Sequence, residues 1–430
     1  MSFAPRKYRR LGLVAAAAAG ALVLIGCTDA GGPGGTAGGA GLPYGSSPEE
    51  FAAALEDMEP VTLIYQTGTA SEDTSYGGQR TVDFKNRIEE YSGGKITVEI
   101  VWANGIAPAA EIDNAMSDGR IDIASLFPIY EPTEYPIGAM VNDLSMTNPG
   151  TVVAGTLSGG ASVIEYGLKY APFTEELLEA GIHLVNPLTA VPPLFIICKD
   201  PVESLADFAG KQIRVSGTAH VRAIEAIGAV PVSLPAAEVY EGLQRGIVDC
   251  ATNSFTTAVS TGTLAVAPFV HHSPEITLAN AMTVPAYGEK VASLPVEAQQ
   301  IVFDALYADQ AASVLGAWDV VYLDLIDAIN NEYGGGFVTL DEDTVAAIKS
   351  AQDAILDEYA ATTVYDAASL PEDMAALQEK WAGIVAELGY TDAGPLEDFT
   401  EWYTPGSVDV QPWLDRLYEE VLNDVRPGHV

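Results

Sequence analysis

The sequence predicts an α/β fold built from two domains and one long helix. Residues 61–126 alternate between strand-like and helix-like patterns, and residues 211–253 repeat this alternation farther along the chain. Such alternation is typical of sheets covered by helices. Residues 296–333 hold a helical pattern with one glycine and no proline. At 1.5 Å per residue this pattern would span about 55 Å, so we expect one helix that braces both domains, rather than two helices broken near Gly316.

The first α/β unit ends two of its strands in polar or aromatic residues. Its predicted elements are a strand at 61–65, a helix at 77–91, a strand at 96–102, a helix at 109–116 and a strand at 121–126. Thr67 follows the first of these strands, and Phe127 and Tyr130 follow the last. Ligands gather at the carboxyl ends of strands in such units, so these loops are candidate parts of a binding site.

The second unit contains a cation in an unexpected place. Arg214 lies inside the apolar strand 213–215, and a loop with Ser216 and Thr218 follows it. Asn253 follows a later strand of the same unit. A buried guanidinium requires an anionic partner. That partner is either a ligand or a nearby acid such as Glu238 or Asp249.

The chain begins with the features of a secreted lipoprotein. Residues 11–25 form an apolar run shorter than a membrane span. The residues before it include four cations, which are Arg6, Lys7, Arg9 and Arg10. The run ends in Leu24-Ile25-Gly26-Cys27, which resembles a bacterial lipobox. We therefore expect residues 1–26 to be a removed signal peptide, Cys27 to carry the lipid, and residues 27–58 to form a flexible linker. A plain secretory signal or an uncleaved anchor is the other interpretation.

Composition restricts the partners and the chemistry. The formal net charge of −39 argues against nucleic acid and anionic lipid as partners. No metal-ligand spacing, phosphate-cradling glycine loop or G-x-S-x-G motif is found. His271 and His272 are the only paired histidines, and neighbouring residues of a strand face opposite ways. We predict no enzyme activity, no cofactor and no metal.

Two further cysteines, Cys198 and Cys250, lie in apolar strand-like runs. An extracytoplasmic compartment permits a disulfide, but free cysteines are also commonly buried as small apolar residues. We expect two separate buried thiols rather than a bridge.

Several segments of the chain resemble the extracytoplasmic solute-binding proteins of TRAP transporters (tripartite ATP-independent periplasmic), the dicarboxylate-binding-protein family. The matching segments are residues 84–100, 112–123, 173–182, 204–215 and 237–253. The resemblance implies a two-lobed, periplasmic-binding-protein-like fold whose α/β domains are joined by crossing hinge strands. It places domain I at residues 59–190 plus 279–318, and domain II at residues 191–278 plus 319–430.

The resemblance also implies a function and partners. The chain would bind a small organic carboxylate outside the cytoplasm, anchored to the outer face of the cell membrane through Cys27. It would deliver the ligand to the small and large membrane subunits of a TRAP permease. A receptor for an ABC importer and a ligand sensor without transport are the alternatives.

The resemblance assigns Arg214 to the ligand carboxylate and Asn253 to a further ligand contact. Positions that are polar or aromatic in the acidic-sugar branch of the family differ here, and they fall at Leu194, Ala236, Phe127 and Tyr130. One strong cation and a more apolar or aromatic wall favour a single carboxylate on an apolar or aromatic body. A dicarboxylate would require a second donor, such as Thr67, Ser216 or Thr218, or a bound cation.

Overall fold

The computed structural model describes residues 41–73, 75–185, 192–280 and 283–428, all within the compact unit Gly38–Val430. The predicted signal peptide, Cys27 and the first part of the linker lie outside the described residues. Within the described residues, no helix is both long and apolar enough to cross a membrane.

The first lobe is built around a five-stranded sheet in the order β2-β1-β3-β10-β4. Its strands are β1 (Val61–Gln66), β2 (Ile96–Val101), β3 (Ile123–Leu126), β4 (Ile182–Leu184) and β10 (Val284–Gly288). β1 pairs in parallel with β2 and β3, whereas β10 enters antiparallel from much later in the chain. Apolar side chains on one face of these strands, such as Leu63 and Val98, are buried. The predicted first α/β unit is confirmed.

The second lobe is built around a six-stranded sheet in the order β11-β9-β5-β8-β6-β7. Its strands are β5 (Phe195–Cys198), β6 (Gln212–Val215), β7 (Val230–Ser233), β8 (Cys250–Asn253), β9 (Phe269–His272) and β11 (Gly336–Thr339). β6 pairs in parallel with β7 on one side and β8 on the other. Arg214 therefore lies within a strand, as the sequence predicts, and that strand is an inner one of the sheet.

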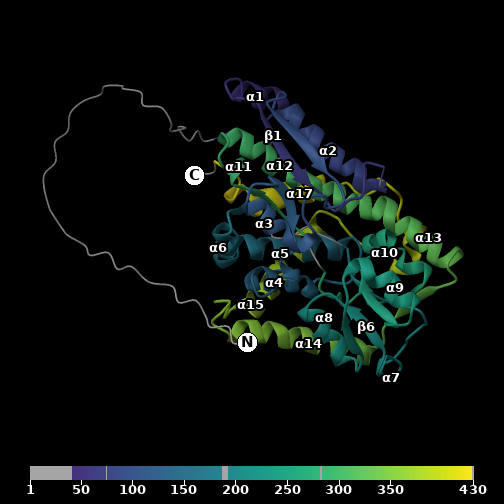
Figure 1. Ribbon diagram of the computed structural model, residues 1–430. Helices are drawn as coiled ribbons and strands as arrows, with labels where there is room; N and C mark the ends of the chain where they lie inside the picture. Colours follow the sequence, from purple (N-terminus) through teal and green to yellow (C-terminus); the bar gives the residue numbers. More distant parts are fainter. Residues whose placement is uncertain (1–40, 74, 186–191, 281–282, 429–430) are drawn as a thin grey trace, which may run out of the picture. The chain divides into compact units, whose positions relative to one another are not determined.

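Helices and short turns cover both sheets (Figure 1). Those of the first lobe are α1 (Pro48–Ala54), α2 (Ser75–Tyr91), α3 (Ile112–Ser117), the turn η2 (Pro128–Tyr130), α4 (Pro136–Asp143), α5 (Ala154–Lys169), α6 (Ala171–Glu179) and α11 (Glu289–Ala292). Those of the second lobe are α7 (Leu205–Phe208), α8 (Thr218–Ala226), the turn η4 (Ala236–Glu238), α9 (Val239–Gln244) and α10 (Phe255–Thr261).

A long helix contacts both lobes. It consists of α12 (Val296–Gly316), a π-helical segment (Ala317–Tyr322) and α13 (Leu323–Asn331). Helical backbone continues through Ala317, so the chain does not break near Gly316. Asp309 on α12 pairs with Arg80 of α2 at 3.2 Å, and the ring of Tyr322 packs on Phe255 of α10 at 4.7 Å. The predicted brace is confirmed.

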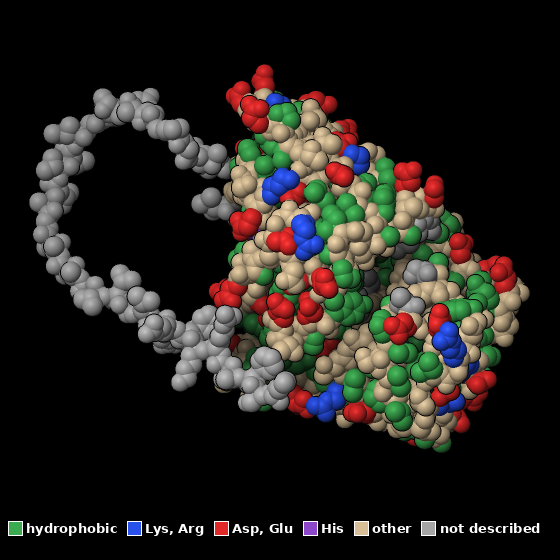
Figure 2. Space-filling model, in the orientation of Figure 1, with side chains coloured by type: hydrophobic (Ala, Val, Ile, Leu, Met, Phe, Trp, Pro, Cys, Tyr) green, Lys and Arg blue, Asp and Glu red, His purple; other side chains and the backbone are tan. Residues whose placement is uncertain are grey.

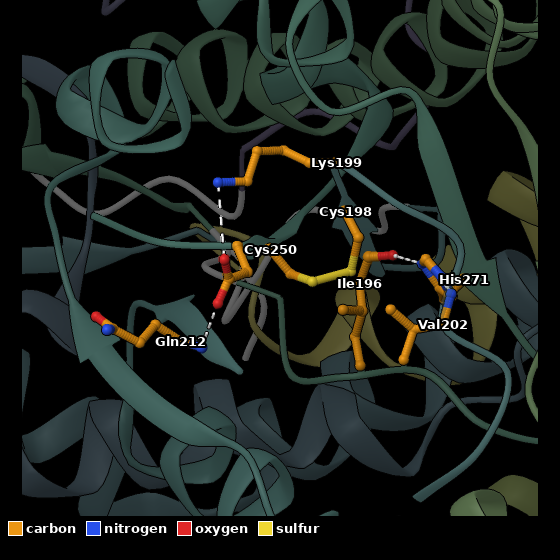
Figure 3. The surroundings of a disulfide bond; sticks show 8 residues. Ile196, Cys198, Lys199, Val202, Gln212, Cys250 and His271 are labelled. Atoms are coloured by element: carbon orange, nitrogen blue, oxygen red, sulfur yellow. Dashed lines mark hydrogen bonds and ion pairs between the residues drawn. A yellow bond between two sulfur atoms is a disulfide. The ribbon is translucent and has the colours of Figure 1, made fainter. Parts of the chain in front are cut away.

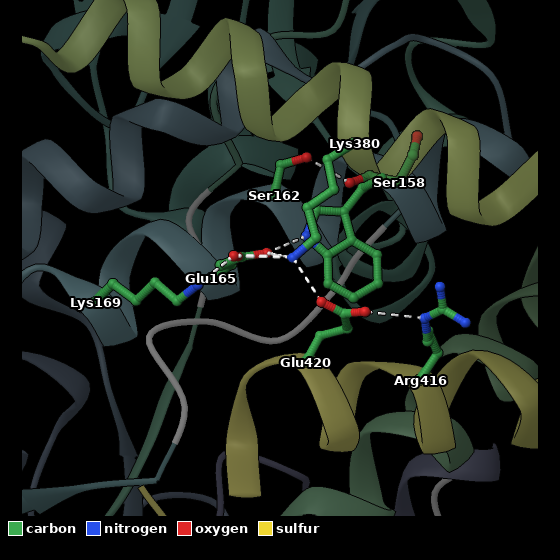
Figure 4. A network of polar contacts seen from close by, with 8 residues as sticks. Ser158, Ser162, Glu165, Lys169, Lys380, Arg416 and Glu420 are labelled. Carbon is green, nitrogen blue, oxygen red and sulfur yellow. Dashed lines mark hydrogen bonds and ion pairs between the residues drawn. The ribbon is translucent and has the colours of Figure 1, made fainter. Parts of the chain in front are cut away.

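The last helices tie the chain end to earlier segments. They are α14 (Glu342–Ala361), α15 (Leu370–Glu387), α16 (Phe399–Trp402) and α17 (Gln411–Glu420). α14 packs on α8, and α15 packs on α5. Figure 4 shows the polar contacts across α5 and α15: buried Glu165 accepts hydrogen bonds from Lys380 Nζ at 2.8 Å and Trp381 Nε1 at 2.7 Å. Lys380 also reaches Glu420 of α17 at 3.1 Å.

The two strand cysteines form a disulfide, so the prediction of separate thiols is wrong. Cys198 on β5 and Cys250 on β8 are directly opposite in the antiparallel register, with Cα atoms 4.0 Å apart and an S–S distance of 2.00 Å (Figure 3). The register of two strands separated by 52 residues decides this pairing, and spacing along the chain does not reveal it.

His271 supports the same region of the second sheet. Its Nε2 accepts a hydrogen bond from Val202 N at 2.8 Å, so its Nδ1 carries the proton and donates to Ile196 O at 3.0 Å (Figure 3). Burial lowers the pKa of His271 to about 4, although the bond to Ile196 acts in the opposite direction. This neutral ring has a structural role between strands.

Candidate ligand-binding site

Arg214 is a buried cation bonded to neutral groups. Its side chain is 5% exposed. Nε donates to Leu234 O at 2.9 Å, and Nη1 donates to Thr252 O at 3.1 Å. Two carbonyls orient the guanidinium without neutralising it. Burial lowers the pKa of Arg214, and interaction with Tyr130 raises it.

The acids considered as partners of Arg214 are engaged elsewhere or exposed. Asp249 accepts a hydrogen bond from Gln212 N at 2.9 Å and lies 3.7 Å from Lys199 Nζ (Figure 3). Glu238 is exposed. Among the ion pairs found in the described residues, none involves Arg214. A buried, oriented and unneutralised guanidinium is suited to a carboxylate from outside the chain.

The turn after β3 in the first lobe carries an aromatic pair. Phe127 and Tyr130 lie at the carboxyl end of β3, with stacked rings 5.3 Å apart at an angle of 17°. Tyr130 is 38% exposed and interacts electrostatically with Arg214. Between them along the turn, Ile129 touches the loop after β6. A side chain at Gly217 would place its Cβ only 2.6 Å from Ile129 Cδ1, so glycine permits this close approach of the two lobes.

His220 organises the loop that follows Arg214. Its Nδ1 accepts from Ser216 N at 3.3 Å and lies 3.2 Å from Thr252 Oγ1. The proton must therefore be on Nε2, which donates to Ala279 O. Burial lowers the pKa of His220 to about 4, the bond to Ala279 raises it and the charge of Arg214 lowers it further. A neutral histidine thus joins the Arg214 loop, β8 and the segment that leads back to the first lobe.

The other predicted site residues differ in how far they are buried. Asn253 is buried, and its Nδ2 donates to Thr263 Oγ1 at 3.3 Å. Leu194 is buried before β5, and its N–H donates to Thr277 Oγ1 at 2.8 Å. Ala236 opens the turn η4 and is half-buried.

Of the three predicted hydroxyl donors, Thr67 and Ser216 are half-buried, and Thr218, the first residue of α8, is exposed. Ser216 Oγ lies 3.1 Å from His220 Nδ1, in the loop beside Arg214. Thr67 Oγ1 lies 3.2 Å from Thr69 Oγ1, so this contact stays within the first lobe. The structure therefore places Ser216 in the loop beside Arg214 and lets Tyr130 interact electrostatically with Arg214, whereas among the described contacts Phe127 is linked to them through its stacking on Tyr130. It does not link Thr67 to them by any described hydrogen bond.

Three carboxylates lie beside the aromatic pair. Asp113, Glu131 and Glu134 each offer an oxygen within 4.8 Å of the others. Asp113 accepts a hydrogen bond from Tyr135 OH at 2.9 Å. Burial, and then the charge of Asp113, raises the pKa of Glu131. The group could hold a cation, but acidic clusters are also common without one; the absence of a resident metal stays a prediction.

Part of the chain matches a known protein family. Residues 195–363 match the family of bacterial extracellular solute-binding proteins, family 7. This match includes Arg214, Ser216, His220 and Asn253. It supports the resemblance drawn from the sequence.

Two curated proteins match shorter or more divergent stretches. A solute-binding protein of Albidiferax ferrireducens is 26% identical over 223 residues, which are 51% of this chain and 62% of that protein. The uncharacterized protein YiiZ of Salmonella typhimurium is 42% identical over 62 residues, which are 14% of this chain and 19% of that protein. The matched stretches thus span less than two thirds of either relative.

Solved structures share the fold at low sequence identity. An extracytoplasmic solute receptor of Bordetella pertussis that binds pyroglutamic acid has a TM-score of 0.60 at 17% identity, covering 73% of this chain and 99% of that one. The periplasmic ectoine-binding protein of a Halomonas elongata TRAP transporter gives 0.60 at 18%, covering 76% and 100%. A marine metagenome TRAP solute-binding protein specific for aromatic acids gives 0.58 at 18%, covering 76% and 100%. These likenesses confirm the predicted two-lobed α/β fold.

Proposed function

We propose that this protein is the extracytoplasmic solute receptor of a TRAP-type secondary transporter. It binds a small organic acid between its two lobes and delivers it to the membrane permease. The observation that carries the proposal is Arg214, a buried guanidinium held by two carbonyls and paired with no described carboxylate. The family match over residues 195–363 supports the same function.

The ligand is a compact acid with one carboxylate and a flat or apolar body. Arg214 is the strong cation of the site, and the stacked rings of Phe127 and Tyr130 form an aromatic wall opposite it. Leu194 and Ala236 add apolar surface, while Ser216 and Asn253 supply polar groups for a ring substituent. Aromatic faces favour offset stacking with another ring. A dicarboxylate finds no second buried cation among these residues.

Binding proceeds by closure of the lobes around the acid. The carboxylate meets Arg214 on the second lobe, and the turn with Phe127 and Tyr130 then covers it from the first. Closure removes water and strengthens the ion pair, because charges attract more strongly at low dielectric. The ligand shifts the open–closed equilibrium only by its differential affinity for the closed form.

The receptor works as a carrier and catalyses no reaction. A lipid on Cys27 tethers it to the outer face of the membrane, and residues 27–58 act as the linker. Domain I comprises residues 59–190 plus 279–318, and domain II comprises residues 191–278 plus 319–430. The permease partners are the small and large membrane subunits of a TRAP system. A neighbouring gene for an ATPase would instead indicate the receptor of an ABC importer. The absence of any neighbouring permease gene would indicate a ligand sensor.

A thermal-shift screen of the purified protein against organic acids tests the proposal. A ligand that binds only the folded protein raises the melting temperature, and the rise grows with the ratio of ligand concentration to dissociation constant. We expect aromatic and apolar monocarboxylates to raise it and sialic acid to leave it unchanged. A screen in which no carboxylate changes the melting temperature would overturn the proposed function.

A further inference from the structure

Asp143, the last residue of α4, is a buried carboxyl with no role in the site described above. Its side chain is 3% exposed. Oδ2 accepts a hydrogen bond from Tyr359 OH at 2.7 Å, whereas Oδ1 has no hydrogen-bond partner among the described residues. No lysine or arginine acts on its ionisation. A carboxylate in these surroundings has lost water without gaining a cation.

The position of Asp143 joins the two lobes. α4 belongs to the first lobe and packs on the turn that carries Tyr130. The backbone N–H of Ala219, at the start of α8 in the second lobe, acts on the Asp143 carboxyl. Ala219 is two residues after Gly217, the point where the lobes touch. Tyr359 comes from α14, which packs on α8. The lobe that supplies Arg214 thus covers Asp143 from two sides.

We propose that Asp143 is a positioning residue that couples closure of the two lobes to the uptake of a proton. When the lobes part, water reaches the carboxyl and it ionises as an ordinary aspartate. When they close, α8 and α14 remove this water and leave Oδ1 without a donor. The closed form then favours the neutral carboxyl, and the proton comes from solvent.

The direction of the pH effect follows from the ionisation in the closed form. Burial raises the pKa of Asp143 from 3.8 to about 7, against the hydrogen bond from Tyr359 and the influence of the backbone N–H of Ala219, which both favour the carboxylate. Between these values the closed form binds a proton that the open form lacks, so closure becomes more favourable as the pH falls through about 7. Above that pH neither form is protonated and the dependence ends.

Two other carboxyls near α4 also have raised pKa values: burial raises the pKa of Glu176, which accepts hydrogen bonds from Ile137 N and Gly138 N of α4, and the pKa of Glu131, beside the turn η2. The tyrosines and the histidine near Asp143 shift away from neutral pH. Burial raises the pKa of Tyr359 and of Tyr365, and it lowers the pKa of His220 to about 4. Arg222 of α8 and Glu358 of α14 form an exposed ion pair at 2.9 Å. α4 contains no other charged residue. The Asp143→Asn variant therefore decides whether the proton belongs to Asp143.

Small-angle X-ray scattering of the ligand-free protein tests this coupling. We expect a smaller radius of gyration at about pH 5.5 than at about pH 8.5, because protonation of Asp143 favours the closed form. Asp143→Asn, a neutral side chain of the same shape, should keep the small radius at both pH values. Asp118→Asn, which changes an exposed carboxylate paired with Arg120 in the same lobe, should retain the wild-type dependence.

Two results would overturn the proposal: a wild-type radius that does not change with pH, or an Asp143→Asn variant that changes as the wild type does. If Asp143→Asn does not fold, Tyr359→Phe provides the second test. It removes a hydrogen bond that stabilises the carboxylate, so the transition should move to higher pH; an unmoved transition contradicts the coupling. The inference rests on the proposed function only in treating the closed form as the ligand-holding one. Because scattering uses no ligand, failure to bind any acid would leave this result unaffected.

Discussion

At the scale of single residues, we propose that recognition of the ligand depends on Arg214. Replacing Arg214 with alanine removes the anion's main partner from a buried site. We expect binding of a carboxylate to weaken by about 2–5 kcal/mol, measured by isothermal titration calorimetry. Arg214→Lys should recover only part of this loss, since an ammonium cannot make the two parallel hydrogen bonds of a guanidinium.

Arg222→Ala is the matched control for this experiment. Arg222 lies on α8 near the site, but its side chain is 48% exposed and paired with Glu358. Exposed ion pairs contribute little, so its loss should leave affinity nearly unchanged. Wild-type affinity in Arg214→Ala would remove the basis of the proposed site.

The sequence singled out Arg214 within a strand because an arginine flanked by apolar residues is unusual and a motif surrounds it. It did not predict the roles of His220 or Asp143. The partners of His220 include Ala279, 59 residues away, and the partner of Asp143 is Tyr359, 216 residues away. Contacts of that separation depend on how the lobes pack. The only local signal for His220 was its place four residues after Ser216, at the start of a helix.

At the scale of elements, the disulfide fixes β5 against β8. β5 begins directly after Leu194, and β8 ends in Thr252 and Asn253. Thr252 O accepts a hydrogen bond from Arg214. Replacing both Cys198 and Cys250 with alanine should lower the free energy of unfolding by about 2–4 kcal/mol, because the bridge restricts the unfolded chain. Denaturant titration measures this loss. The reduced wild-type protein should behave like the variant, and the variant should not respond to reductant; equal stability of oxidised and reduced protein would contradict the bridge.

A second prediction at this scale concerns Glu165, which joins α5 to α15. Burial acts to raise the pKa of Glu165, but hydrogen bonds from Lys169, Lys380 and Trp381 outweigh it and lower the pKa below 4.5. Its stabilising effect is therefore present above the unfolded pKa and disappears as the pH falls through the folded value. At neutral pH, Glu165→Gln should reduce the free energy of unfolding by about 1–3 kcal/mol.

The difference between the wild type and Glu165→Gln should shrink in acid, which thermal unfolding at several pH values can follow. Glu175→Gln, at an exposed position on α6, serves as the control and should change little. A difference between wild type and Glu165→Gln that persists unchanged in strong acid would show that the charge of Glu165 is not the cause.

Element prediction worked where the pattern was local. Apolar strands and the proline-free stretch 296–333 were readable because each depends on neighbouring residues. The strand register was not readable, so the disulfide was missed. The π-helical segment Ala317–Tyr322 was also not foreseen, since its apolar pattern is close to that of an ordinary helix.

At the scale of the whole molecule, the two-lobed architecture followed from two α/β units and a resemblance that covers both. The packing of the C-terminal helices could not be predicted in the same way. Trp413 of α17 donates to Leu157 O of α5 at 3.1 Å across 256 residues, a contact that no local pattern specifies. Its effect is to pack the last helices onto the first lobe.

The acidic surface gives the molecule its electrostatic character. Figure 2 shows Asp and Glu side chains spread over the visible face, with few Lys or Arg among them. The formal net charge is −39. A receptor with this charge repels free anions at long range, so a carboxylate must be held by the local field of Arg214. Whether a small molecule binds should therefore depend on whether it carries a negative charge that can pair with Arg214.

The most direct measurement compares a carboxylate with its matching primary amide. The best acid from the thermal-shift screen and its amide have nearly the same shape, but only the acid is an anion. Calorimetry on the wild-type protein should show binding of the acid and a loss of at least about 2 kcal/mol for the amide, and Arg214→Ala should remove most of this difference. Equal binding of acid and amide, or a difference that survives in Arg214→Ala, would contradict carboxylate recognition by Arg214.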